Sequence, residues 1–404
     1  MNRSDPSLKN TQSDLTRPIC VLCPRANTDI AKHRDDEYYQ DGDIQEQGFF
    51  DAIRQWEASG NGRSHHVVIP GVRQGQTGEQ LVKLLQFYYA LGVRYFIMTM
   101  SENLTNVKER FIEWRKTCDI DDAPVLIATI ASAPGLARIA DGIVRYYVRT
   151  EEEAKTLGEF CREKEKCACA ISFYLDNPYG KATSKLFLET VRNKSDVAAP
   201  NCENPVTADD AAEIVNIWFK EYYPAFQRQE IPDLMQRTAI LVAGYGRMLR
   251  ETLSALSLKY AEKSGGFKII ACTSTLTQAA WQPKPSEMDR IIFTVRPNQA
   301  RGGSPGGGGL DRDLVYHFAK RTLLRVLAMA KDAKSTKAFL DRWSLGQFPE
   351  EDDSALDESV ESITGDIAIK VEVINNTRWR HKDSGSGAPM RPRRLSKDSA
   401  ARPK

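Results

Sequence analysis

The 404-residue chain lacks a long hydrophobic run. No stretch approaches the about 20 apolar residues that a membrane-spanning helix needs. Residues 1–18 are polar and contain no apolar segment like the core of an export signal. We therefore expect a protein that is soluble and cytoplasmic. It would be periplasmic or extracellular if its true start lay upstream.

Histidine is scarce, and the side-chain combinations of common catalytic and metal sites are missing. The five histidines are not spaced as helix-borne metal ligands, and no Gly-x-Ser-x-Gly motif occurs. The glycine-rich run 302–309 lacks the Gly-Lys-Ser/Thr ending of a phosphate loop, so we interpret it as a connector. We predict a protein that is not an enzyme, with no catalytic residues, no metal and no cofactor.

A second cysteine pair at zinc-ligand spacing is also missing. Cys20 and Cys23 form a Cys-x-x-Cys, but on a strand their thiols would point to opposite faces. Most of the eight cysteines lie in apolar runs. We expect buried free thiols, which fit a reducing compartment.

The chain has little net charge, with a formal value of +2. This total combines a body of charge −3 with a tail, residues 382–404, of charge +5. The near-neutral sum argues against a sequence-specific nucleic-acid binder. We expect residues 377–404 to be a disordered basic tail, with contact to a protein partner or an anionic surface as the alternative.

Apolar strands alternate with amphipathic helices along the body, which predicts parallel sheets covered by helices on both faces. About ten strands exceed one ordinary sheet, so we predict an α/β fold of two doubly wound lobes. The first helix is expected at Gln45–Ala58, after a charged loop from Asp35 to Asp43. The expected strands are Ile19–Cys23, His66–Pro70, Tyr95–Met100, Pro124–Thr129, Val144–Arg149, Cys169–Leu175, Thr238–Ala243, Phe267–Thr273, Arg290–Val295 and Ile367–Ile374.

Small, polar or aromatic residues follow several of these strands. In doubly wound sheets, ligands bind beyond the carboxyl ends of the strands. Each residue alone is a common cap or turn, but together they predict a ligand cleft. The candidate ligand-binding residues are Ser101, Asn103, Ala131, Ser132, Tyr179, Tyr245, Thr273 and Ser274.

The turn Gly244-Tyr-Gly246 lies between a strand and a helix, as a dinucleotide loop does. Leu249 occupies the third glycine position, and no acid ends the next strand. A nucleotide-dependent enzyme is therefore the weakest of the alternatives.

Several segments, in order over residues 19–376, resemble the type I periplasmic-binding-protein fold. The resemblance is to the branched-chain amino-acid receptors and their receptor-ligand-binding relatives. Besides a first helix containing Gly48, the segments are LGVRYFIMTMSENLT, APVLIATIASAPGL, RYYVRT, YLDNPYGKATSKLF, AILVAGYGRMLRETLSA, FKIIACTS, RIIFTVRP and TGDIAIKVEV.

The resemblance implies two lobes that close on a ligand like a flytrap, joined by a three-crossover hinge. The first lobe would comprise residues 19–147 plus 297–355, and the second 148–296 plus 356–376, after an N-terminal tail over 1–18. Ser101 or Asn103, with Ala131 and Ser132, would bind a ligand carboxylate. Tyr179 and Tyr245 would close over it, and a homodimer would form through lobe 1.

The chain departs from the pattern of the amino-acid receptors at two places. These receptors have an acid near the positions of Thr273 and Ser274, and a small residue at that of Met98. The main hypothesis is a sensor for an amino acid, amide or organic acid, similar to the fold's cytoplasmic amide sensor. The alternative is a scaffold whose cleft is filled by residues such as Met98.

Overall fold

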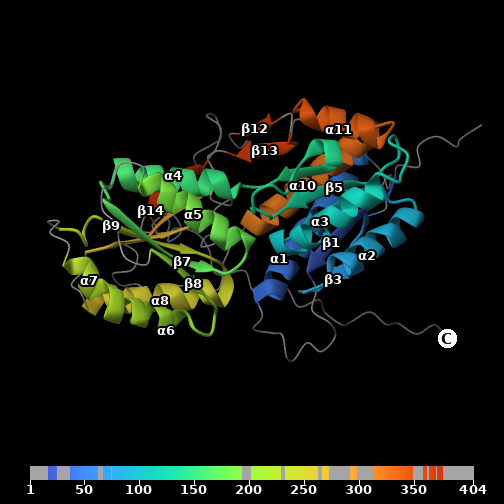
Figure 1. Ribbon diagram of the computed structural model, residues 1–404. Helices are drawn as coiled ribbons and strands as arrows, with labels where there is room; N and C mark the ends of the chain where they lie inside the picture. The colour runs from blue at the N-terminus through green and yellow to red at the C-terminus, as the bar shows by residue number, and fades with distance from the viewer. Residues whose placement is uncertain are drawn as a thin grey trace, which may run out of the picture.

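The computed structural model describes residues 17–24, 37–61, 67–73, 75–192, 202–228, 233–262, 266–272, 292–297, 314–348, 358–361, 364–369 and 371–375. These residues form an α/β molecule with two lobes side by side, each built around one sheet (Figure 1).

The first lobe has a largely parallel sheet with the strand order β12-β13-β6-β5-β4-β1-β2, in which β3 also pairs with β1. Only the pair β12–β13 is antiparallel among the described strands of this sheet. The strands are β1 Ile19–Pro24, β2 Val67–Val68, β3 Gly71–Val72, β4 Tyr95–Thr99, β5 Val125–Thr129, β6 Ile143–Tyr146, β12 Glu358–Glu361 and β13 Asp366–Ile369.

Helices cover both faces of this sheet because alternate apolar side chains of each strand point to opposite sides. Ile97 lies in the core under α1, α10 and α11, whereas its neighbours Phe96 and Met98 lie in the core under α2 and α3. The helices are α1 Glu37–Trp56, continued by η2 Glu57–Asn61, α2 Gly78–Ala90, α3 Ser101–Arg115, η3 Ile139–Asp141, α10 Leu314–Asp332 and α11 Thr336–Ser344.

The second lobe has a sheet with the strand order β14-β11-β10-β9-β7-β8. Its strands are β7 Cys169–Leu175, β8 Glu203–Val206, β9 Thr238–Ala243, β10 Lys268–Ala271, β11 Ile292–Pro297 and β14 Val371–Asn375. One face packs on α4 and α5, and the other on α6 and α8. These helices are α4 Thr150–Glu163, α5 Pro178–Arg192, α6 Ala211–Ile217, continued by η4 Trp218–Tyr222 and α7 Tyr223–Gln227, and α8 Gly246–Glu262.

The chain crosses between the lobes three times, which confirms the predicted fold class. It leaves the first sheet after β6 and enters α4, returns after β11 to α10, and leaves again between β13 and β14. The resemblance implied three crossings and matched the first two to the segments that contain β6 and β11, whereas the segment of β13 and β14 was expected to be a single closing strand.

The C-terminal boundary between the lobes differs from the expected one. The sequence analysis assigned 356–376 to the second lobe, but β12 and β13 belong to the first sheet and only β14 joins the second. Asp366 and Ile367 pair with Arg145 and Tyr146 of β6. The salt bridge between Arg145 and Asp366 reinforces that register, with Nε and Oδ1 2.7 Å apart.

One local prediction was wrong. The region 35–43 was expected to be a loop, but α1 begins at Glu37. Its Gly42 packs so closely on β1 that an added Cβ would lie 2.1 Å from the Pro24 carbonyl oxygen. Within the second sheet, Pro205 lies in β8, a terminal strand of its order, where a residue without an N–H is tolerated.

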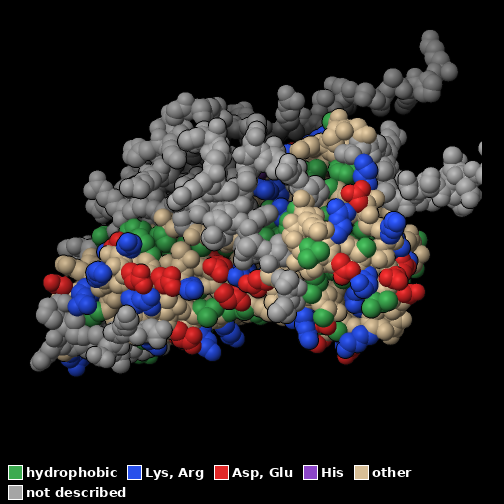
Figure 2. Space-filling view, turned by 90° about the horizontal axis from the view of Figure 1, so that it is seen from above, with side chains coloured by type: hydrophobic (Ala, Val, Ile, Leu, Met, Phe, Trp, Pro, Cys, Tyr) green, Lys and Arg blue, Asp and Glu red, His purple; other side chains and the backbone are tan. Residues whose placement is uncertain are grey.

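The cysteine prediction is confirmed. All eight cysteines are free, and seven of them are buried. On the face seen in Figure 2, basic and acidic side chains are interspersed over the coloured part of the surface.

Candidate functional site

Two strained turns lie next to each other at the carboxyl edge of the first sheet. Thr99 ends β4 and Thr129 ends β5, and the two residues pair in register. The residues that follow, Met100 and Ile130, have φ values of 71° and 53°. Such left-handed conformations are rare for residues other than glycine, especially β-branched ones, and tend to occur at functional sites.

The turn after β4 leads directly into α3. The N-cap position, Met100, makes no side-chain capping hydrogen bond, so the first-turn N–H groups are not satisfied by that residue. A helix start of this kind attracts anions. Ser101, the first helical residue, accepts a hydrogen bond at Oγ from the Ala133 N–H, 3.2 Å away. Ser101 and the loop after β5 are therefore in contact.

The loop after β5 is held from the hinge side. The Ser132 carbonyl oxygen accepts hydrogen bonds from the Thr150 N–H at 3.1 Å and from Thr150 Oγ1 at 2.7 Å. Arg145 Nη1 donates to the carbonyl oxygens of Ser132 and Ala133, at 3.2 and 2.7 Å. Arg145 is itself oriented by Asp366 through two hydrogen bonds of 2.7 and 3.0 Å.

The predicted residues of the first lobe thus occupy two environments. Ser101 and Ser132 are partly exposed at the sheet edge. Asn103 and Ala131 have no exposed surface, and Ala131 packs in the core with α2 and α3. Met98 lies in the same core, so its bulk is accommodated there and does not fill the cleft as the scaffold hypothesis requires.

The two predicted tyrosines of the second lobe lie together. The ring centroids of Tyr179 and Tyr245 are 6.3 Å apart. Tyr179 is buried, whereas Tyr245 is 37% exposed, which is high for a large aromatic side chain. Asn177 Nδ2 donates to Tyr245 Oη at 3.1 Å, and Asn177 Oδ1 accepts from the Gly180 N–H at 2.8 Å. Asn177 therefore connects the start of α5 to the turn after β9.

The turn Gly244-Tyr-Gly246 presents Tyr245 at the carboxyl edge of the second sheet. Gly246 has a φ of 68°, which favours glycine, and a Cβ on Gly244 would clash with Met248 Sδ at 2.4 Å. Leu249, at the position of a third dinucleotide-loop glycine, is fully buried in the core. The two glycines thus serve the turn that carries the tyrosine.

A buried carboxylate lies near the end of β10, where Thr273 and Ser274 were expected to contribute but lie outside the described residues. Cys272, the last described residue there, is buried, and burial raises the pKa of its thiol, with Glu153 raising it further. Glu153 comes from the first turn of α4 and is fully buried. The sequence did not single out Glu153. Residues 151–153 are three successive acids in the first turn of a helix, where negative charge is stabilised by the helix dipole, so the run has an ordinary structural explanation.

Gln45 is another residue that the sequence did not single out. It is fully buried on α1 and lies between two strand ends. The Cys23 thiol at the end of β1 is 3.7 Å from Gln45 Oε1, and Gln45 Nε2 is 3.9 Å from Met100 Sδ. The Gln45 side chain therefore connects α1 to the strained turn after β4.

The hinge beside this edge carries a second ion pair. Arg149, between β6 and α4, pairs with Glu361 of β12 and, at 2.8 Å, with Glu152. Burial alone would lower the pKa of Arg149, but the hydrogen bonds to Glu361 and Glu152 outweigh it, and the net shift is upward. The guanidinium therefore stays charged at the junction of the lobes.

The helices that start at the candidate residues approach each other across the lobes. α3, which begins with Ser101, lies close to α5, which contains Tyr179, and α1 lies close to α8. Figure 1 shows α3 and α5 on the facing sides of the two lobes. The carboxyl edges of both sheets therefore contribute to one region between the lobes. Within the described residues, no group of His, Cys, Asp and Glu is arranged to hold a metal ion.

The sequence matches no protein-family model and no curated protein. Solved structures with the same architecture do match. One is a leucine-, isoleucine-, valine-, threonine- and alanine-binding protein from Brucella ovis in a closed conformation. It has 10% identity and a TM-score of 0.66, and the match covers 88% of each chain.

Two further matches were solved with ligands. A solute-binding protein from R. palustris in complex with 4-hydroxybenzoate has 12% identity and a TM-score of 0.62, over 89% of this chain and 92% of that one. A branched-chain amino acid substrate-binding protein from Streptococcus pneumoniae in complex with isoleucine has 14% identity and a TM-score of 0.61, over 89% and 97%.

The chain has the type I periplasmic-binding-protein fold. At these identities the likeness is one of fold. The fold places the region between the carboxyl edges, described above, where ligands of two-lobed proteins bind. Among the described helices, none combines the length and apolar character needed to cross a membrane.

Proposed function

We propose that this protein is a non-enzymatic receptor that closes its two lobes on a small ligand. The observation that carries the proposal is the meeting of both carboxyl edges in one region. Ser101 and the strained turn at Met100 come from the first lobe, and the exposed Tyr245 from the second. A ligand that contacts both edges favours the closed form by the difference between its affinities for the two forms.

The proposed ligand is an amino acid, an amide or an organic acid. The start of α3, with Ser101, suits a carboxylate or another hydrogen-bond acceptor. The isoleucine and 4-hydroxybenzoate in the similar structures both carry a carboxylate. Glu153 is the candidate partner for an ammonium group, since its charge acts on Cys272, the residue that precedes the positions at which the amino-acid receptors have their acid.

We further propose that the protein is a sensor in the cytoplasm. Support comes from the eight free cysteines, which fit a reducing compartment. In this proposal, two copies pair through the first lobe. The basic tail over 377–404 contacts a protein partner or an anionic surface.

A thermal-shift screen of amino acids, amides, aliphatic acids and hydroxybenzoates tests this function. A true ligand raises the melting temperature by mass action, with a rise of about 2.7 kcal/mol in stability at a hundred times its Kd. The increase should disappear in Tyr245→Ala and persist in Leu258→Ala, because Leu258 is an exposed residue of α8, the helix that follows Tyr245, and lies away from the candidate site. In the same screen, Glu153→Gln should abolish shifts by amines and spare those by simple carboxylates.

If no compound at millimolar concentration changes the melting temperature, the receptor proposal fails. A shift that survives in Tyr245→Ala would place the ligand elsewhere and contradict the proposed site.

A further inference from the structure

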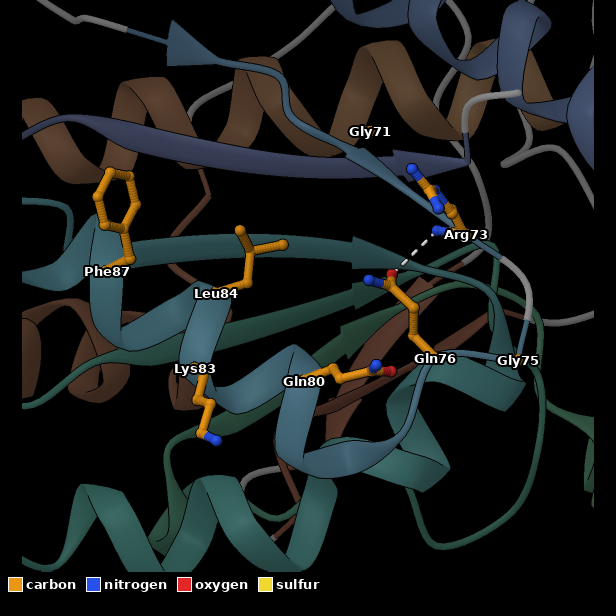
Figure 3. Close-up of a pocket in the computed structure, with 8 residues that line it drawn as sticks. All are labelled: Gly71, Arg73, Gly75, Gln76, Gln80, Lys83, Leu84 and Phe87. Carbon is orange, nitrogen blue, oxygen red and sulfur yellow. Dashed lines mark hydrogen bonds between the residues drawn. The ribbon is translucent and has the colours of Figure 1, made fainter. Parts of the chain in front are cut away.

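A second concave surface lies on the outer side of the first lobe. It is a groove of about 640 Å³ between β3 and α2. Figure 3 shows Arg73 and Gln76 at one end of the groove and Phe87 at the other. The residues that line it are Gly71, Arg73, Gly75, Gln76, Gln80, Lys83, Leu84 and Phe87.

The groove runs beside the edge of the first sheet. β2 is the last strand in the order, and within the described residues β3 pairs with β1 alone. In the part of the chain that the structure describes, one side of β3 is therefore unpaired, as is the sheet edge in proteins that bind extended peptides there. Gly75, which also lines the groove, has open space beside it: a Cβ built on this residue would meet no atom within 4 Å.

The charge of the groove is positive. Its lining contains Arg73 and Lys83 and no acidic residue. Arg73 is exposed and makes no ion pair within the described part of the chain. Lys83 pairs with Glu79 at 2.7 Å, and Arg110 is also near: the hydrogen bond from Lys83 lowers the pKa of Glu79, and Arg110 lowers it further. Two cations, Lys83 and Arg110, therefore lie near the one carboxylate of Glu79.

The other end of the groove is apolar and exposed. Phe87 is 59% exposed, and Leu91, one turn further along α2, is 62% exposed. Together with Leu84 they form an apolar strip on one face of the helix. Neighbouring exposed apolar side chains beside charged residues are a feature of protein interaction sites.

We propose that this groove binds an acidic segment of a partner protein, in extended form. Acidic side chains would lie at Arg73 and Lys83, and apolar side chains would pack on Leu84 and Phe87. The positive charge selects an acidic partner, and it disfavours the chain's own basic tail, residues 382–404. The open edge of β3 favours an extended chain over a compact small molecule.

The test measures fluorescence anisotropy of a short labelled peptide in which a run of Glu precedes alternating Leu and Ser. A matched peptide with Lys in place of Glu is the control. The full-length protein should bind the Glu peptide, more weakly as salt is added, and should not bind the Lys peptide. Arg73→Glu and Phe87→Ser should each weaken binding by about tenfold, the effect expected for loss of one charged or one apolar anchor.

Two exposed residues of the other lobe supply matched control variants. Lys185→Glu and Leu258→Ser make the same kinds of change on α5 and α8 and should leave the affinity unchanged. Circular dichroism and melting curves check that each variant is folded, and Arg73→Gln replaces Arg73→Glu if the reversal of charge unfolds the protein.

Three results would overturn the proposal. The first is failure of the wild-type protein to bind the Glu peptide at millimolar concentration, and the second is equal binding by the groove variants and the controls. The third is a dimer in light scattering that Phe87→Ser dissociates and that excludes the peptide, which would identify a second copy as the occupant. None of these results depends on the ligand of the cleft.

Discussion

Arg145 carries a charge in the interior of the first lobe and uses it to hold the candidate site. Its side chain is 1% exposed, and it bonds Asp366 and the carbonyl oxygens of Ser132 and Ala133. Removing one partner of such a pair leaves a buried charge uncompensated, which costs more than the pair contributes. The loop after β5 therefore depends, through Arg145, on Asp366, which lies 221 positions after Arg145 in the sequence.

We predict that Asp366→Ala lowers the free energy of unfolding by about 3–5 kcal/mol, because Arg145 then remains charged and unpaired in the core. Urea denaturation measures the change. Asp341→Ala, which removes an exposed pair with Lys337, should have little effect. The double change Arg145→Met with Asp366→Leu should recover much of the loss. Equal effects of Asp366→Ala and Asp341→Ala would contradict this role.

The sequence indicated some residues of the candidate site and not others, for a physical reason. Ser101, Ser132 and Tyr245 follow shortly after predicted strands. Because the carboxyl ends of parallel strands meet at one edge of a sheet, their positions in the sequence are enough to place them at that edge. Glu153 and Gln45 lie on helices and reach the site region through packing of distant segments. No spacing in the sequence indicates such an approach.

Among the elements, α1 and α10 pack unusually closely at Gly48. An added Cβ at this glycine would lie 2.5 Å from the Tyr316 carbonyl oxygen and 3.0 Å from the Ala319 Cβ. The close approach brings the apolar face of α10 onto the sheet, in one core with Phe49 and Tyr146. Gly48 is thus retained inside a helix despite its unfavourable helix propensity.

Gly48→Ala should destabilise the protein by about 1–3 kcal/mol, the usual cost of overpacking, although alanine favours the helix by about 1 kcal/mol. Thermal and urea denaturation provide the measurement. Gln47→Ala, at an exposed position of the same helix, is the control and should be nearly neutral. A Gly48→Ala protein as stable as the wild type would show that α1 and α10 do not pack as described.

Element types were predictable where apolar periodicity is strong, as in β4, β5, β7 and β9. The charged stretch over 35–43 has no such periodicity, and its helix packs Gly42 onto Pro24. The sheet to which β12 and β13 belong was not predictable, because it depends on pairing with β6 at long range. Local sequence does not determine which of two sheets a strand joins.

For the whole molecule, the pattern of strands and helices was sufficient to predict two lobes, and the resemblance implied the three crossings. Alternating strands and helices require parallel sheets, and too many strands for one sheet require two. The ligand was not predictable, because cleft chemistry depends on which side chains of separate segments meet. The proposed region comprises the sheet edges around Ser101 and Tyr245, and Glu153 is its proposed acidic residue.

Closure of the two lobes by a ligand is the basis of the proposed function. Small-angle X-ray scattering of the full chain, with and without the compound that most raises the melting temperature, tests it directly. We predict that the compound decreases the radius of gyration of the wild-type protein and leaves that of Tyr245→Ala unchanged. A compound that stabilises the protein at saturation without changing its radius of gyration would contradict the claim.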